Sequence, residues 1–209
     1  MKTSITSLII TVLTTISLSI ATSEAKASEQ NTVTVLNTVK NVRDIVVSGN
    51  VDLILVQKQV ESVKVYDKYY SKNALIQQQD GVLRISSYAK ERLTIIAYVN
   101  AISSIEASEN AKVTTHGTFN LLSLNVILRD DAQADINAST INLTTSVNDR
   151  AKLNLAGNAI DYAGKMSAMA KVTMDQFTAD CSSIRSVAPV YSAKIVLAKE
   201  DADDMILQP

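Results

Sequence analysis

The stretch Ala151-Lys152-Leu153-Asn154-Leu155 decides the fold, because the chain repeats its pattern five times. Each copy starts with alanine, continues with Lys or Gln, and places mostly apolar side chains two and four residues after the alanine. The copies start at Ala111, Ala132, Ala151, Ala170 and Ala193, with spacings of 21, 19, 19 and 23 residues. A repeat near 20 residues is too short for arrays of helical hairpins and fits one circuit of a β-solenoid.

The three middle repeats carry a second alternating run of side chains. The runs are Leu122, Leu124, Val126, Leu128; Ile141, Leu143, Thr145, Val147; and Ile160, Tyr162, Gly164, Met166. A period of two residues is the strand period, with alternate side chains on one buried face. Short polar segments between the runs, such as Asn148-Asp149-Arg150, are typical of turns. We therefore expect each unit to be strand, tight turn, strand and looser turn.

Together the repeats predict an all-β fold, a single-stranded right-handed β-helix or β-solenoid with rungs of about 20 residues and an irregular first half. No single unit can bury its apolar face, so stacked units must share one core. We expect Val113, Leu153, Val172 and Ile195 in that core.

The chain divides into four regions. Residues 1–27 are predicted to be a signal peptide, since Lys2 and an apolar stretch over 8–20 precede the cleavage motif Ala25-Lys26-Ala27. The alternative is an uncleaved anchor, although a span needs about 20 apolar residues. Residues 28–100 are an irregular β-rich portion, 101–200 the regular repeats and 201–209 a tail or cap. We expect a secreted or periplasmic protein with no transmembrane span after cleavage.

The composition bears on nucleic-acid binding, disulfide formation and strand content. Removing residues 1–27 changes the formal net charge from −1 to −2, which gives no indication of nucleic-acid binding. The single Cys181 excludes an intramolecular disulfide and is expected to be a small buried hydrophobe. Many Val, Ile, Leu and Thr residues and the absence of Trp are typical of a β-rich chain.

The first half contains two turn signals. In Ile45-Val46-Val47-Ser48-Gly49-Asn50-Val51-Asp52-Leu53-Ile54-Leu55, apolar residues alternate across a Gly-Asn step that can take positive φ. Further on, Asp80-Gly81 separates Leu75-Ile76 from Val82-Leu83-Arg84-Ile85 and predicts a hairpin.

Over residues 39–197, the chain resembles the head GIN domain family of auto-transporter adhesins. The resemblance rests on residues 45–55, on residues 82–85 and on the later repeats. The resemblance implies a secreted bacterial β-solenoid with an irregular first portion and an adhesin-like role. It brings no catalytic residues. The family's turns are commonly rich in glycine, whereas this chain has alanine without glycine at the repeat turns, which argues against positive φ at the alanines.

The residue after each alanine predicts a ligand-binding column. If the repeats stack, Lys112, Gln133, Lys152, Lys171 and Lys194 point away from the core on neighbouring strands about 4.8 Å apart. The column is either a solvated stripe or a cationic track for an anionic polymer, such as a surface polysaccharide. Lys112, Lys152, Lys171 and Lys194 are the candidate ligand-binding residues.

Acidic residues in the turns give a candidate calcium site at Asp130, Asp131 and Asp149, with Asp135 nearby. Ordinary solvated turns are the competing interpretation. Solenoid polysaccharide lyases also use such acidic clusters. The lone His116 lacks the companions of a usual zinc site, and we expect no cofactor and no transition metal.

These observations favour a non-catalytic, adhesin-like binding protein of the bacterial envelope, with a surface polysaccharide or an envelope protein as partner. A carbohydrate-active enzyme such as a polysaccharide lyase, and a structural accessory protein of the envelope, remain the alternatives.

Overall fold

The computed structural model describes residues 33–66 and 74–187, all within one compact unit that begins at Thr32. The expected signal peptide (1–27), the expected tail (201–209) and the fifth repeat with Lys194 and Ile195 lie outside the described residues.

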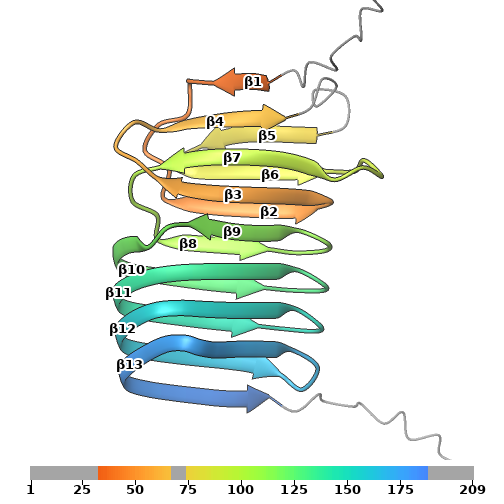
Figure 1. Ribbon diagram of the computed structural model, residues 1–209. Helices are drawn as coiled ribbons and strands as arrows, with labels where there is room; N and C mark the ends of the chain where they lie inside the picture. The colour runs from red at the N-terminus through yellow and green to blue at the C-terminus, as the bar shows by residue number, and fades with distance from the viewer. Residues whose placement is uncertain (1–32, 67–73, 188–209) are drawn as a thin grey trace, which may run out of the picture. The chain divides into compact units, whose positions relative to one another are not determined.

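Every regular element in these two ranges is a β-strand, and together the strands form one thirteen-stranded sheet (Figure 1). In chain order they are β1 (Val33–Leu36), β2 (Asp44–Gly49), β3 (Val51–Gln57), β4 (Ser62–Tyr66), β5 (Ala74–Gln79), β6 (Val82–Ser87), β7 (Leu93–Val99), β8 (Ser104–Ala107), β9 (Lys112–His116), β10 (Phe119–Leu128), β11 (Gln133–Val147), β12 (Lys152–Ser167) and β13 (Lys171–Val187). The protein is therefore all-β over its described residues, as the sequence predicts. This part of the chain contains no helix long and apolar enough to cross a membrane.

The sheet curls over, so that two ladders of parallel strands face each other across the core (Figure 1). One ladder contains β6, β2, β8 and β10, and the other contains β7, β3 and β9. The long strand β11 belongs to both, because its first residues pair with β9 and its second half pairs with β10. β12 and β13 follow the same bent course and extend both ladders.

The long strands pair with a constant offset at their first residues. Gln133 of β11 lies beside Lys152 of β12, and Lys152 lies beside Lys171 of β13, so partners are 19 residues apart. This offset equals the spacing between Ala132, Ala151 and Ala170 in the sequence.

The repeated alanines close the tight turns between the two ladders. The Ala151 N–H donates to the carbonyl oxygen of Asn148 at 3.1 Å, and Ala111 and Ala132 close equivalent turns. These three alanines are fully buried. The positive φ of each turn falls two residues before the alanine, at Glu109, Asp130 and Asp149. The expectation that the alanines themselves avoid positive φ therefore agrees with the structure.

The core lies between the ladders and is dominated by aliphatic side chains. Val113 and Leu153 are buried there, as predicted. Val172 of β13 packs against the core but is only partly buried. It belongs to the last strand of the described sheet, and the described residues supply no further layer of side chains on that side.

One buried polar contact accompanies this packing. The hydroxyl oxygens of Tyr162 and Thr145 lie 2.9 Å apart in a hydrogen bond, and the Tyr162 ring meets Phe177 edge to face at 5.4 Å. Burial raises the pKa of the Tyr162 phenol, while the bond to Thr145 acts in the opposite direction. A Cβ at Gly164 would lie 2.7 Å from the Tyr162 hydroxyl, so glycine leaves the space for this ring.

The first half mixes strand directions. β1 pairs antiparallel with β4, β4 with β7, and β5 with β6. Asp80 and Gly81 form the predicted hairpin turn between β5 and β6, with φ of 52° and 81°. Gly49, with φ of 80°, makes the predicted step between β2 and β3.

The interpretation of Leu122, Ile141 and Ile160 as core residues is wrong. Their exposed fractions are 77%, 43% and 47%. Each is followed by a second exposed residue, and only then does the buried alternation resume, for example at Leu124. The strands bend around an outer corner here, and a bend can turn two successive side chains outward. A strict period of two therefore fails at this place.

Position 157, near this bend, requires glycine for two reasons: its backbone conformation and the close approach of the adjacent strand β11. Its φ is +99°, and a Cβ would lie 2.2 Å from the carbonyl oxygen of Ala138 on β11. Only glycine lets the two strands approach this closely without displacing the backbone.

We predict that Leu153→Asp unfolds the stacked strands cooperatively. The buried carboxylate would have no cationic partner, and such burial costs about 3 kcal/mol or more. Urea denaturation followed by circular dichroism measures the loss. Asn154→Asp is the matched control, because Asn154 is the exposed neighbour on the same strand. Equal unfolding midpoints for the two variants would contradict the inward placement of Leu153.

We also predict that Gly157→Ala lowers the thermal midpoint more than Gly117→Ala does. Both glycines have positive φ, but a Cβ at Gly117 meets no atom within 4 Å. Gly117→Ala should therefore cost about 1 kcal/mol of backbone strain. Gly157→Ala adds the clash with Ala138 and should cost roughly 3 kcal/mol or more. Calorimetry of both variants measures the two thermal midpoints and so distinguishes backbone strain from steric contact. Equal decreases in the midpoint would contradict the close approach of Gly157 to Ala138.

Candidate functional site

The predicted lysines lie on adjacent strands in one register. Lys112 of β9 is beside Gln133 of β11, followed by Lys152 of β12 and Lys171 of β13. We call these four residues the lysine column. Asp52 of β3 continues it beyond Lys112 and reverses the sign of the charge there. The cationic part of the column thus lies over the later strands.

The members of the lysine column differ in their partners. Lys112 Nζ lies 3.8 Å from Asp135 Oδ2, an ion pair between half-exposed side chains. Lys152 and Lys171 are exposed, direct cross-strand neighbours. Neither of them forms an ion pair with any of the residues described in the structure. Two like charges directly opposite each other are destabilising, so this pair is the part of the column best suited to attract an anion.

A shallow groove of about 190 Å³ runs beside the lysine column. One wall is formed by Gln133, Lys152 and Lys171 of the column. The other wall is formed by Asp135, Asn154 and Thr173, and Ala134 and Leu153 lie between the walls. The groove therefore combines two unpaired cations with amide, hydroxyl and carboxylate groups that can form hydrogen bonds.

The candidate calcium residues take part in the turns. Asp130 Oδ2 accepts a hydrogen bond from the Glu109 N–H at 3.0 Å, and Asp149 Oδ2 accepts one from the Asp130 N–H at 3.1 Å. Each carboxylate thus binds the backbone of the preceding turn, at the residue with positive φ. Aspartate suits this position, because its short polar side chain tolerates the left-handed region.

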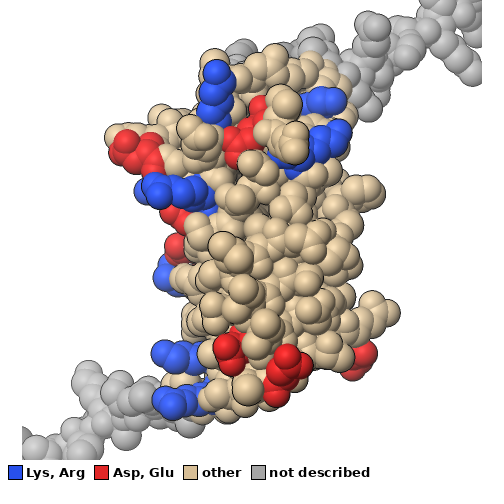
Figure 2. Space-filling view, turned by 90° about the vertical axis from the view of Figure 1, so that its left-hand side faces the viewer, with Lys and Arg blue, Asp and Glu red and all other residues tan. Residues whose placement is uncertain are grey.

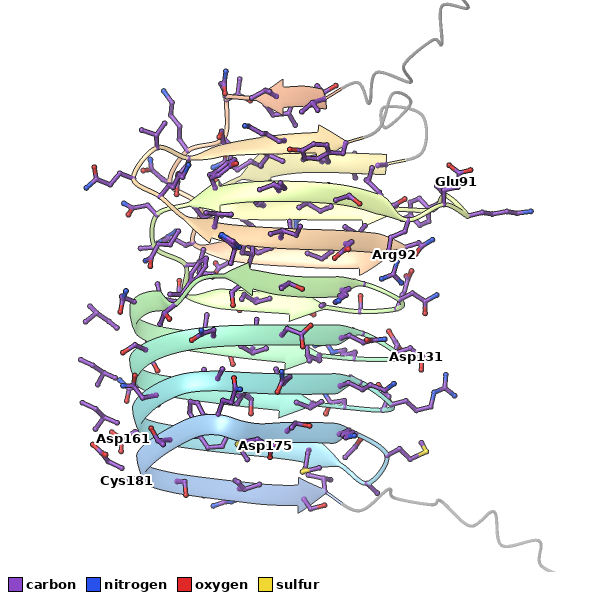
Figure 3. All side chains as sticks on the ribbon, viewed as in Figure 1. Glu91, Arg92, Asp131, Asp161, Asp175 and Cys181 are labelled. Atoms are coloured by element: carbon purple, nitrogen blue, oxygen red, sulfur yellow. The ribbon has the colours of Figure 1, made fainter. Side chains whose placement is uncertain are left out.

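Asp131 is held by a cation from the next turn. Arg150 Nε and Nη2 donate to its two carboxylate oxygens at 2.8 and 2.6 Å. Figure 3 shows Asp131 at the tight-turn side of the stack. Hydrogen bonding to Arg150 is the main cause that lowers the pKa of the Asp131 carboxyl from its usual value of 3.8.

In residues 33–66 and 74–187, no three His, Cys, Asp or Glu side chains gather closely enough to hold a metal ion. The calcium site at Asp130, Asp131 and Asp149 stays a prediction, and the contacts seen here give these carboxylates turn-stabilising roles. His116 is the last residue of β9 and is exposed.

The expectation of a buried Cys181 is wrong, because the thiol is exposed. Cys181 lies beside Asp161 on the outer side of the bend, and Figure 3 shows both at the same edge of the stack. Its side chain points outward from β13. The sequence did not reveal this direction, because the alternation of inward and outward side chains is interrupted at the bend.

The bend carries a surface that the sequence did not reveal. Leu122, Ile141 and Ile160 line a shallow groove of about 460 Å³ together with Asn120, Ser139 and Asn158. Figure 2 shows a broad area without charged side chains on this side of the protein, with acidic groups near its lower end. Recognising these residues as exposed requires the position of the bend, for which the sequence has no clear signal apart from Gly157.

The geometry defines an all-β protein whose parallel strands carry extended ladders of exposed side chains. The chain belongs to the family described as "Putative auto-transporter adhesin, head GIN domain", whose model matches residues 41–189. No curated protein matches the chain.

Solved structures share the fold. A putative adhesin from Bacteroides fragilis has a TM-score of 0.64 at 12% identity, covering 77% of this chain and 79% of its own. A putative adhesin from Parabacteroides distasonis has a TM-score of 0.58 at 15% identity, with coverages of 75% and 78%. A protein from the same species described as a putative lipid binding protein has a TM-score of 0.61 at 7% identity, with coverages of 74% and 78%. At these identities the likeness concerns the fold alone.

We predict that Arg150→Gln raises the pKa of Asp131 toward its usual value. In the native protein, the lowered pKa means that the pair contributes stability at pH values above 3.8, and that this contribution is lost as the pH falls through the folded-state pKa. NMR titration of the Asp131 carboxyl measures the shift. Arg129→Gln is the control, because Arg129 pairs with Glu106. An unchanged Asp131 pKa in Arg150→Gln would contradict the assigned cause.

Proposed function

We propose that this protein is a secreted or periplasmic, non-catalytic, adhesin-like protein of the bacterial envelope that binds acidic polysaccharide along the lysine column. The observation that carries the proposal is the register that aligns Lys112, Gln133, Lys152 and Lys171 on adjacent parallel strands. Membership of the adhesin head family supports the general role. Secretion rests on the predicted signal peptide.

We further infer that the regular half is a right-handed, single-stranded β-solenoid with rungs of about 20 residues. The 19-residue offset between the starts of β11, β12 and β13 supports a continuous winding. Parallel crossovers within a sheet are right-handed in nearly all proteins, which supports the hand. In a solenoid the side ladders have a fixed spacing, and a linear polymer with repeated groups suits such a surface.

Electrostatics favours an anionic ligand. Lys152 and Lys171 lie on strands about 4.8 Å apart, and an anionic group between them would relieve their repulsion. Because the protein as a whole is slightly acidic, this attraction is local and should weaken as salt screens it. Lys112 would contribute less, since Asp135 already neutralises it.

The neighbouring groove favours a sugar over a simple ion. Asn154 and Thr173 offer hydrogen-bonding groups along the same line as the two lysines. Repeated carboxylates and hydroxyls of an acidic polysaccharide could satisfy both walls at once. The exposed, shallow form of this groove suits binding along a chain, whereas an enzyme would need a site that positions a catalytic acid and base.

We predict that Lys152→Gln/Lys171→Gln weakens binding to an acidic polysaccharide such as alginate or polygalacturonate by roughly 5- to 30-fold. Two surface charge contacts are worth about 1–2 kcal/mol together. The salt dependence of the remaining binding should be flatter, and the thermal midpoint equal or higher, since a like-charge pair is removed. Calorimetric titration at two salt concentrations measures the affinity.

Lys165→Gln/Arg185→Gln is the matched control. These two cations are also direct neighbours on β12 and β13, in the other ladder. Equal losses in the two double variants would mean nonspecific charge attraction, and binding unchanged in both would contradict the column. Cleavage of the polysaccharide during the titration, abolished by a calcium chelator, would favour the lyase alternative instead.

A further inference from the structure

β13 is the edge of the described sheet. It pairs with β12 along its length, and the residues in the described ranges supply no strand on its other side (Figure 1). Within the described ranges, its outward-facing N–H and C=O groups over residues 171–187 therefore have no partner strand. A long, regular edge of this kind invites strand addition from another chain, which natural proteins normally prevent.

The core is also open at β13. Val172, Met174, Phe177 and Ala179 pack on the core but are only partly buried, unlike Leu153 and Leu155 of the strand before. A small cavity of about 80 Å³ remains between the ladders at this end. It is lined by Thr145, Tyr162, Gly164, Lys165, Met166, Val172, Met174 and Ile184. The opening is mainly apolar, so an apolar side chain fits it better than water.

The sequence that follows β13 has the pattern of a further strand. Residues 188–209 include Ala193-Lys194-Ile195-Val196-Leu197, which repeats the pattern of Ala170-Lys171-Val172-Thr173-Met174. In the two preceding circuits this pattern brings the Lys or Gln residues side by side and the next residues into the core. The same register would place Ile195 beside Val172 and Leu197 beside Met174, facing the cavity.

We propose that residues 194–198 add to β13 as a parallel strand, with Ile195 and Leu197 filling the open end of the core. The six residues 188–193 connect the two strands, and Pro189 is acceptable there because a connection needs no ladder N–H from it. The occupant of the edge is thus the protein's own chain. This inference does not depend on the proposed ligand.

The residues beyond this strand suit a protective role. After Lys199, an acidic run follows it, made of Glu200, Asp201, Asp203 and Asp204. Charged side chains at an edge oppose the addition of another chain, because stacking copies would bring like charges together. The added strand would then cover the edge at residues 171–175, and the acidic run beside it would oppose stacking of a second copy there.

Hydrogen exchange on the full chain tests this placement. In the native protein, the outward-facing amides of residues 171–175 should be protected by the added strand. Ile195→Asp should release that strand, because the charge would enter an apolar cavity, and these amides should exchange at least tenfold faster. Val196→Asp is the matched control, since Val196 would face solvent between the two inward residues. Amides of β11 serve as the internal reference for an intact fold.

Three outcomes would overturn the proposal. One is exchange at β13 that is fast in the native protein, and a second is an equal response to Ile195→Asp and Val196→Asp. The third is a protein that sediments as a dimer and loses protection at β13 on dilution, which would assign the edge to a second copy of the chain.

Discussion

Parallel pairing between successive passes of the chain is the constraint on which the rest of the structure depends. One pass has an apolar side but no partner that could bury it, so each strand is stabilised by the strands before and after it. Pairing in register also satisfies the backbone polar groups of both ladders. The tight turns must therefore be identical in length, and the buried alanines and left-handed Asp130 and Asp149 keep them so.

The same constraint explains the roles of the turn carboxylates. Residues that repeat along a stack meet their equivalents from the next turn, so a polar side chain can serve the neighbouring backbone. Asp130 and Asp149 do this through the N–H groups of Glu109 and Asp130. Asp131 meets the Arg150 guanidinium one turn later. Asp131 and Arg150 thus compensate each other on the turn side, whereas Lys152 and Lys171 lie beside each other on the ladder face.

Stacking thus produces both linear surface arrays and an end with a distinct environment from one geometry. Exposed side chains become linear arrays, as in the lysine column and in the row of Leu122, Ile141 and Ile160 at the bend. At β13, however, the described residues supply no further layer for the backbone groups and the apolar side chains. The end of such a stack therefore needs residues that prevent strand addition, whereas its faces carry the repeated exposed side chains.

The sequence by itself determined the all-β class, the repeat spacing, the inward direction of Val113 and Leu153, the Asp80-Gly81 hairpin and the alignment of the lysines. These follow from local periodicity and turn chemistry, which short stretches encode. Only the tertiary structure decided that Leu122, Ile141, Ile160 and Cys181 face outward, and that Asp131 pairs with Arg150. Those outcomes depend on where the strands bend and which turns become neighbours, and both are set by packing between segments distant in sequence.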